Sequence, residues 1–174
     1  MSVPGVIPIH EQLHAGCVID VHGVVEHGHH KNFAVELVSG PHVVLHVNFR
    51  FHHEHEVVMN SCSHGNWGVE VRHKNPLHHG DHFHLHIHVH QDHYEIKVNG
   101  HHLADYLHRF PKESVQGLGL KGDVNVEKVD FSGFGFHVDW NKVHDFGHGG
   151  YSAYGTEHYE PPTVSMFLMS ASIL

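Results

Sequence analysis

The chain has 174 residues, 40% of them hydrophobic, which suits one globular domain with a sizeable core and a short appendage. Its formal net charge is −9 with histidine neutral, so neither a nucleic acid nor an anionic membrane surface is an expected partner. The 28 histidines are the anomaly, because protonating half of them would move the charge to about +5 (−9 + 14).

The N-terminal residues 1–9 lack a basic segment and a long apolar run, so we expect no signal peptide. Residues 3–9 are rich in proline and suit an extended edge strand. The next residues, His10-Glu11-Gln12-Leu13-His14, match the His-Glu-x-x-His pattern of zinc peptidases, which requires a helix with both imidazoles on one face. Because the segment lies between Pro8 and Gly16 and leads into a strand-like run, we interpret the match as chance.

Short strand-like runs separated by turns then follow to about residue 129, with no convincing helical period. No stretch approaches about 18 consecutive apolar residues, so we expect no membrane insertion. This pattern predicts an all-β fold made of two antiparallel sheets packed as a sandwich. The expected strands lie within residues 17–25, 33–38, 43–51, 57–60, 67–72, 82–90, 94–100, 103–110 and 118–129.

Cys17 and Cys62 are the only cysteines, too few for a disulfide framework in a chain of this length. Each lies in or beside a strand-like run. We therefore expect both to be small buried or half-buried hydrophobic residues.

The run at 43–51 carries polar residues on one face of a half-buried strand. Alternation sends Leu45, Val47, Phe49 and Phe51 to the core side and His46, Asn48 and Arg50 to the other. These three residues offer an imidazole, a neutral amide and a fixed cationic fork in one row. Such a row suits a neutral polyhydroxylated ligand.

The two following runs supply further groups of the same kind. Asn60 adds another amide, and Glu70 can orient neighbouring guanidinium groups such as that of Arg72. Trp67 offers a flat apolar platform with a polar edge. Since strict alternation places Trp67 opposite Glu70, the backbone near Gly68 must depart from an ideal strand if both residues contact one ligand.

In their order and spacing, these three runs resemble the sugar-binding signature of the galectins, His-x-Asn-Pro-Arg, Val-x-Asn and Trp-Gly-x-Glu-x-Arg. The resemblance implies seven carbohydrate-binding residues: His46, Asn48, Arg50, Asn60, Trp67, Glu70 and Arg72. The departure is Phe49, where the family usually has proline. Its side chain falls on the core side, so we do not expect it to occlude the polar row.

The resemblance covers about residues 3–136 and implies a galectin carbohydrate-recognition domain with a jelly-roll sandwich. It implies a non-catalytic, metal-independent lectin for terminal galactose of lactose or N-acetyllactosamine, with no cofactor, catalytic residue or metal ligand. The implied partners are β-galactoside glycans on glycoproteins or glycolipids. A homodimer or a tandem partner would be needed for cross-linking. Galectins are cytoplasmic and are also exported without a signal peptide, which the resemblance extends to this chain.

The resemblance also assigns roles to the seven residues. His46, Asn48 and Arg50 would bond the axial 4-hydroxyl of galactose, and Asn60 and Glu70 the 6-hydroxyl. The Trp67 indole would cover the apolar ring face. Arg72, together with Glu70 and Arg50, would reach the 3-hydroxyl of the next sugar.

Residues 137–174 differ from the rest, being rich in Gly, Tyr and His up to Pro161-Pro162 and apolar at the end. This tail is too short for a second domain. Packing on the sandwich, disorder and a linker toward a second sugar-binding domain all remain open.

Histidine occupies every second position from His82 to His90, which places five imidazoles on one face of a strand. Such a row can share Zn²⁺, Cu²⁺ or Ni²⁺, so a metal-binding or pH-responsive protein on a galectin scaffold is one alternative. A row alone guarantees neither four ligands nor an oriented second shell, so we expect only weak adventitious binding of metals. A second alternative, resting on Phe49 and the tail, is a sugar-silent galectin-like module that acts through protein contacts.

Enzymatic functions find no support in the motifs. The sequence contains no Gly-x-Ser-x-Gly elbow, phosphate-binding loop or dinucleotide fingerprint. We therefore expect binding without catalysis.

Overall fold

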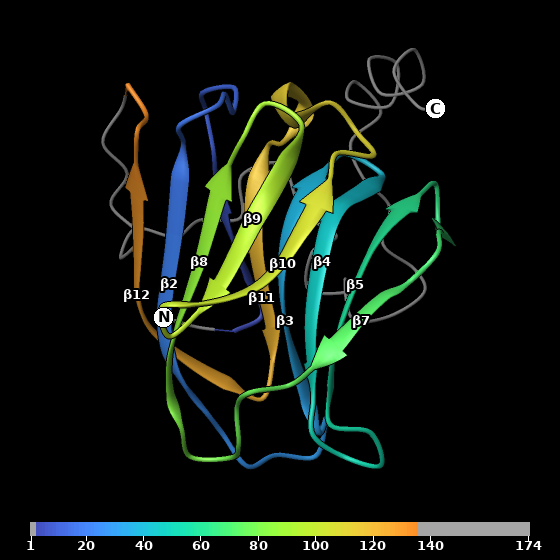
Figure 1. Ribbon diagram of the computed structural model, residues 1–174, viewed down its shortest axis with the longest axis vertical. Helices are drawn as coiled ribbons and strands as arrows, with labels where there is room; N and C mark the ends of the chain where they lie inside the picture. Colours follow the sequence, from blue (N-terminus) through green and yellow to red (C-terminus); the bar gives the residue numbers. More distant parts are fainter. Residues whose placement is uncertain (1–2, 136–174) are drawn as a thin grey trace.

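The computed structural model describes residues 3–135, which form two antiparallel β-sheets packed face to face (Figure 1). The seven-stranded sheet has the order β1 (Gly5–Pro8), β11 (Gly117–Gly122), β3 (Asn32–Ser39), β4 (His42–Arg50), β5 (Glu56–Ser63) and β6 (Asn66–Trp67), with β7 (Val71–Lys74) also paired to β5. The five-stranded sheet has the order β10 (His101–Leu107), β9 (His93–Val98), β8 (His82–Val89), β2 (Val18–Val25) and β12 (Val124–Ser132). A short 3₁₀ helix, η1 (Lys112–Ser114), precedes β11.

This arrangement confirms the prediction of an all-β, two-sheet antiparallel sandwich of the jelly-roll type. The edge position expected for the proline-rich start of the chain is also confirmed, since β1 lies at the end of the seven-stranded sheet. Within residues 3–135, no helix is long and apolar enough to cross a membrane. The predicted tail, residues 137–174, lies outside the described residues.

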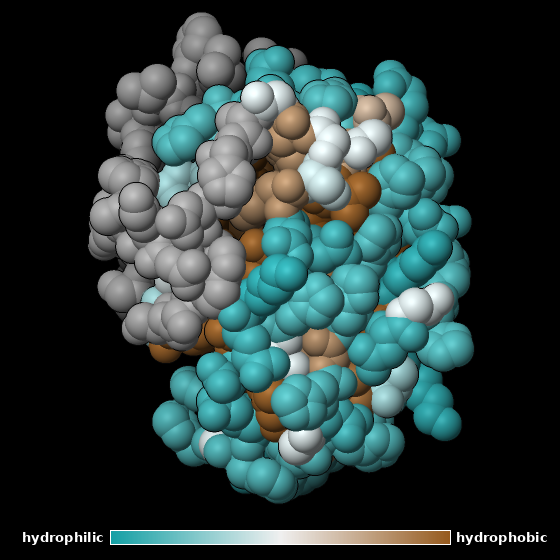
Figure 2. Space-filling model, turned by 90° about the vertical axis from the view of Figure 1, so that its left-hand side faces the viewer, coloured by the Kyte–Doolittle hydropathy of each residue, from teal (hydrophilic) through white to brown (hydrophobic). Residues whose placement is uncertain are grey.

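Period-two alternation builds the core between the sheets. On β8, Phe83, Leu85, Ile87 and Val89 are buried, while the histidines between them remain partly exposed. Seen from the side on which β12 lies, hydrophilic residues cover most of the described surface, and hydrophobic residues appear in patches along its middle (Figure 2).

Phe49 belongs to this core, as the alternation of β4 predicts. Its side chain is completely buried, and its ring stacks on Phe33 of β3 with the centroids 4.7 Å apart. The residue that departs from the family pattern therefore faces away from the polar row of β4 and contributes to packing.

The strand-like segment expected at 118–129 consists of two strands, β11 and β12. Gly122 ends β11 with a φ of +95°, and Val124 begins β12 in the other sheet. A side chain at Gly122 would place its Cβ 2.4 Å from the carbonyl oxygen of Asn32. The chain changes sheets here because glycine permits both this conformation and this close approach.

Within the described part of the chain, the structure shows neither a disulfide between the cysteines nor the helix that the His-Glu-x-x-His pattern requires. Cys17 and Cys62 are buried and unbridged, as expected. The match at His10–His14 lies in the connection between β1 and β2, which has no helix. Glu11 instead accepts hydrogen bonds from the backbone N–H of Gly135 at 2.9 and 3.0 Å, which anchors the end of the described chain.

His42, at the start of β4, is expected to make the fold less stable in acid. Its side chain is fully buried, and its Nδ1 accepts the backbone N–H of His64. Burial, with a smaller effect of the His64 charge, lowers the pKa of His42 from 6.5 to about 4. His42 therefore binds a proton more readily in the unfolded chain than in the folded one. Its contribution to the free energy of unfolding is lost as the pH falls from about 6.5 to about 4.

A His42→Gln variant keeps an acceptor but cannot titrate. Its free energy of unfolding should fall by about 2 kcal/mol less than that of the wild type between pH 7 and pH 4.5. Urea unfolding at both pH values measures this difference, with the exposed His101→Gln as the control variant. Equal losses in the wild type and His42→Gln would contradict the assignment.

Candidate functional site

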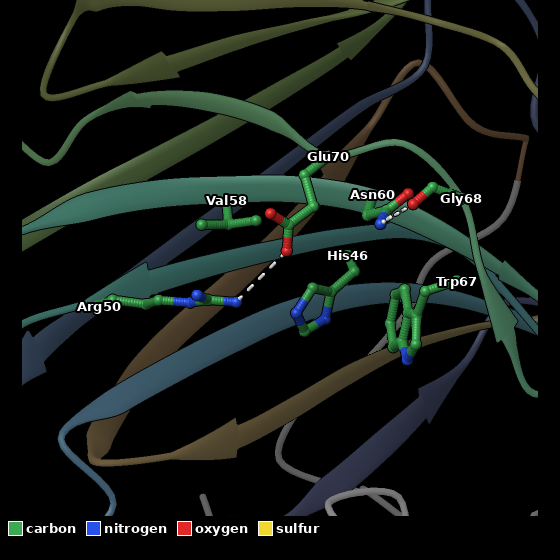
Figure 3. A pocket seen from close by; sticks show the side chains of 7 residues that line it. All are labelled: His46, Arg50, Val58, Asn60, Trp67, Gly68 and Glu70. Atoms are coloured by element: carbon green, nitrogen blue, oxygen red, sulfur yellow. Dashed lines mark hydrogen bonds and ion pairs between the residues drawn. The ribbon is translucent and has the colours of Figure 1, made fainter. Parts of the chain in front are cut away.

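An open pocket of about 420 Å³ lies over β4, β5 and the segment that links β6 to β7 (Figure 3). Its lining combines charged, amide and aromatic groups with a little apolar surface. Arg50 and Trp67 lie toward opposite ends, His46 lies between them, and the Glu70 carboxylate points toward them from one side. The lining residues are His46, Arg50, Val58, Asn60, Trp67, Gly68 and Glu70.

A buried carboxylate fixes the His46 ring. Glu36 lies directly opposite His46 in the β3–β4 pairing, and its Oε2 is 2.6 Å from His46 Nδ1. Because an ionised carboxylate can only accept, Nδ1 carries the donated proton. Nε2, the other ring nitrogen, is then left for a ligand in the pocket.

Arg50 is held from three directions. Its Nε donates to Asn48 Oδ1 at 2.8 Å, one Nη donates to Glu54, and the other lies 3.9 Å from Glu70. The Asn48 amide group already donates to Asn32 and to the backbone of Phe33. Asn48 is therefore 93% buried behind Arg50 and does not line the pocket.

Arg72 is surrounded by carboxylates. It donates to Glu54 at 2.6 Å, to Glu56 at 2.8 Å and to Glu70 at 2.8 and 3.0 Å. Glu56 and the other two carboxylates raise the Arg72 pKa, while hydrogen bonds from Arg50 and then Arg72 lower the pKa of Glu54. Two guanidinium groups and three carboxylates sum to a charge of −1, so the site has strong hydrogen-bonding groups with little net charge.

Asn60 fastens the segment that carries the indole. Its amide donates to the Gly68 carbonyl at 2.8 Å, and its oxygen accepts from Arg109 at 2.9 Å. Arg109 also donates to the Val69 carbonyl at 2.8 Å. These bonds hold the chain where it leaves β6 at Trp67 and before it enters β7 at Val71. The departure from a strand that was expected near Gly68 is thus present.

The Trp67 indole forms one wall of the pocket. Half of the residue's surface is exposed, and its ring centroid lies 4.9 Å from that of His46. An exposed indole beside polar groups can cover an apolar ligand face while those groups bind hydroxyls.

Five of the seven residues expected from the sequence line this pocket: His46, Arg50, Asn60, Trp67 and Glu70. Asn48 and Arg72 are not among its lining residues, but they are bonded to Arg50 and Glu70 respectively. The orienting role expected of Glu70 is present, since its carboxylate accepts from Arg72.

Sequence reasoning missed four supporting residues: Glu36, Glu54, Glu56 and Arg109. Glu54 could have been found, because it lies four residues after Arg50 in an acidic turn. Glu36 and Arg109 gave no local signal. Glu36 meets His46 only through the pairing of β3 with β4, and Arg109 reaches Asn60 from a distant part of the chain.

The comparisons with known proteins find relatives of this chain in one family. The family model for galactoside-binding lectins matches residues 4–131. A probable galaptin of Caenorhabditis elegans, lec-8, is 62% identical over 161 residues, covering 92% of this chain and 89% of the relative. Another, lec-7, is 46% identical over 143 residues, covering 82% and 80%. The crystal structure of the C. elegans galectin LEC-6 superposes with a TM-score of 0.71 at 30% identity, covering 76% of this chain and 92% of that one.

Galectins are non-enzymatic carbohydrate-binding lectins, so neither the match nor the site indicates catalysis. The family model covers well over half of the chain, and five of the seven residues that the resemblance implied line one pocket. The chain is a member of the galactoside-binding lectin family, the galectins.

Proposed function

We propose that this chain binds the terminal β-galactose of lactose- or N-acetyllactosamine-type glycans in the pocket beside Trp67, without metal or catalysis. The observation that carries the proposal is the half-exposed indole beside His46, with Arg50, Asn60 and Glu70 around the same pocket. The recognition unit is residues 3–136, and family membership and the name galaptin of two relatives support the ligand class.

The proposed contacts follow from the groups that the protein leaves available. His46 Nε2 and the Arg50 guanidinium bind the axial 4-hydroxyl. Asn48 acts through Arg50, because its Oδ1 accepts the hydrogen bond that Arg50 Nε donates. Asn60 retains one N–H for the 6-hydroxyl beside Glu70, because the other is bonded to Gly68. Arg72 holds Glu70 and reaches toward the 3-hydroxyl of the next sugar.

Selectivity for galactose comes from the fixed direction of these groups. An epimer with an equatorial 4-hydroxyl would leave His46 Nε2 and the Arg50 guanidinium without their partner beneath the bound sugar, at a cost of about 1–3 kcal/mol for each. A shallow pocket gives weak affinity for one sugar, so cross-linking of glycoproteins or glycolipids requires a homodimer or a tandem partner. Family membership favours a cytoplasmic protein that is also exported without a signal peptide.

Affinity chromatography tests the proposal directly. The untagged chain should bind to lactosyl resin, remain bound during an EDTA wash, and elute with lactose but not with sucrose. Elution by EDTA or imidazole alone would contradict metal-independent sugar binding. Passage through the column would favour a sugar-silent protein.

Removing the charge behind His46 should weaken binding without changing a pocket residue. In Glu36→Gln, the oxygen of a neutral amide, a weaker acceptor, replaces the carboxylate oxygen that accepts from His46 Nδ1, so the imidazole is oriented less firmly. We expect lactose to bind about 5- to 10-fold more weakly by isothermal titration. The control is Glu127→Gln, a partly exposed carboxylate on β12. Equal affinity in Glu36→Gln and the wild type would exclude this role for Glu36.

A further inference from the structure

The outer face of the five-stranded sheet places imidazoles between carboxylates. β8 is the middle strand, with β2 on one side and β9 on the other (Figure 1). Asp20 of β2 lies opposite His86, and Glu95 of β9 lies opposite His88. The histidine row is therefore flanked on both sides by acidic side chains and is not simply facing solvent.

One cluster on this face has the composition of a metal site. Asp20 Oδ1 lies 2.6 Å from His84 Nε2 and 2.7 Å from His86 Nδ1. The three side chains are partly buried, with exposures of 18%, 38% and 25% respectively. We propose that Asp20, His84 and His86 form a binding site for a divalent transition-metal ion, with water completing the coordination.

The chemistry of these groups fits such an ion. Two imidazoles and one carboxylate are ligands for Zn²⁺, Cu²⁺ or Ni²⁺, and Zn²⁺ binds them at about 2.0–2.2 Å. Tetrahedral ligands at that distance lie about 3.3 Å apart, so the present separations must widen by about 0.6 Å. Partly exposed side chains can make this change by small rotations, as the ion replaces the protons now shared between them.

Neighbouring groups both support and limit the site. The His22 ring stacks on His84 with centroids 4.3 Å apart and planes 10° apart, which restricts the orientation of that ligand. Lys97 is paired with His86 across β8 and β9, and its positive charge opposes that of the ion. We therefore expect a moderate affinity.

A second group, His88, His90 and Glu95, is looser than the first. Its carboxylate oxygen lies 3.7 and 3.2 Å from the two ring nitrogens, and Glu95 also belongs to a third group with His102 and Asp105. Glu95 is thus shared between two groups, so filling one of them competes for the carboxylate of the other. Asp20 belongs to only one of the three groups found among the described residues, which favours the Asp20 site as the first to fill.

Isothermal titration of the untagged full chain with Zn²⁺ at pH 7.5 tests the proposal. The wild type should show one event of about 1:1 stoichiometry ahead of weaker binding by the other histidines. In the double variant Asp20→Asn/His86→Gln, the Zn²⁺ affinity of this first event should be at least about 10-fold weaker. The matched control, His29→Gln/His30→Gln, removes an exposed pair of adjacent imidazoles and should retain it.

Two further measurements keep the test independent of folding and of sugar binding. Without metal, thermal unfolding of each variant should match that of the wild type, and single Asp20→Asn and His86→Gln variants replace the double variant if it does not fold. Zn²⁺ should raise the Tm of the wild type and the control more than that of the Asp20 variants.

Superimposable isotherms for the wild type and the double variant would show diffuse binding to surface histidines only and overturn the proposal. Lactose affinity should not change in any of them, because the pocket lies on the other sheet.

Discussion

Replacing Trp67 with alanine is expected to weaken lactose binding by about 2–3 kcal/mol, or about 30- to 150-fold, while the fold is retained. The indole is half exposed, so its removal costs the fold less buried surface than removal of a fully buried aromatic ring would. A bound galactose, by contrast, would lose the apolar wall that covers one face of its ring. The remaining polar groups would then have to hold a sugar whose apolar face stays in water.

A control for this substitution lies two residues away. Val69 lies in the same segment and is 80% exposed. Its backbone carbonyl accepts a hydrogen bond from Arg109, and a change of side chain leaves that carbonyl in place. Val69→Ala should therefore bind lactose as the wild type does. Isothermal titration of both variants measures the difference. If Trp67→Ala retained the wild-type affinity, the pocket would not be the sugar site.

The sequence was sufficient to predict the polar row of β4 because strand alternation is a local rule. Leu45, Val47 and Phe49 are buried, and His46 and Arg50 face the pocket, as their positions require. The break before Glu70 was also predictable, since an indole and a carboxylate three residues apart reach one pocket only if the strand is interrupted.

The supports of these residues were not predictable, because they arise from pairing between distant segments. Glu36 meets His46 through the register of β3 and β4, and Arg109 reaches Asn60 from the connection after β10. Register depends on the whole sheet, so one sequence does not fix which side chains become partners. The same limit applies to the histidine row, whose flanking Asp20 becomes visible only when β2 is paired with β8.

Substitution of Phe49 should reduce stability more than any surface change discussed above. The ring is completely buried against Phe33, so Phe49→Ala is expected to lower the free energy of unfolding by about 3–5 kcal/mol. Phe49→Leu, which keeps most of the volume, should lose less. Urea unfolding, with Val69→Ala as the surface control, measures both changes.

Phe49→Pro separates the two explanations of this departure from the family pattern. β4 lies between β3 and β5, and Phe49 is paired with Phe33 on one side and with Val57 on the other, so proline is expected to remove a ladder hydrogen bond as well as the ring. We expect lower stability and, for the molecules that remain folded, an unchanged lactose affinity, because the Phe49 side chain points away from the pocket. Tighter lactose binding by a stable Phe49→Pro variant would show instead that phenylalanine here impairs the site. Since the aromatic partner Phe33 is present on the neighbouring strand, we expect phenylalanine at this position to be maintained by packing and not by the ligand.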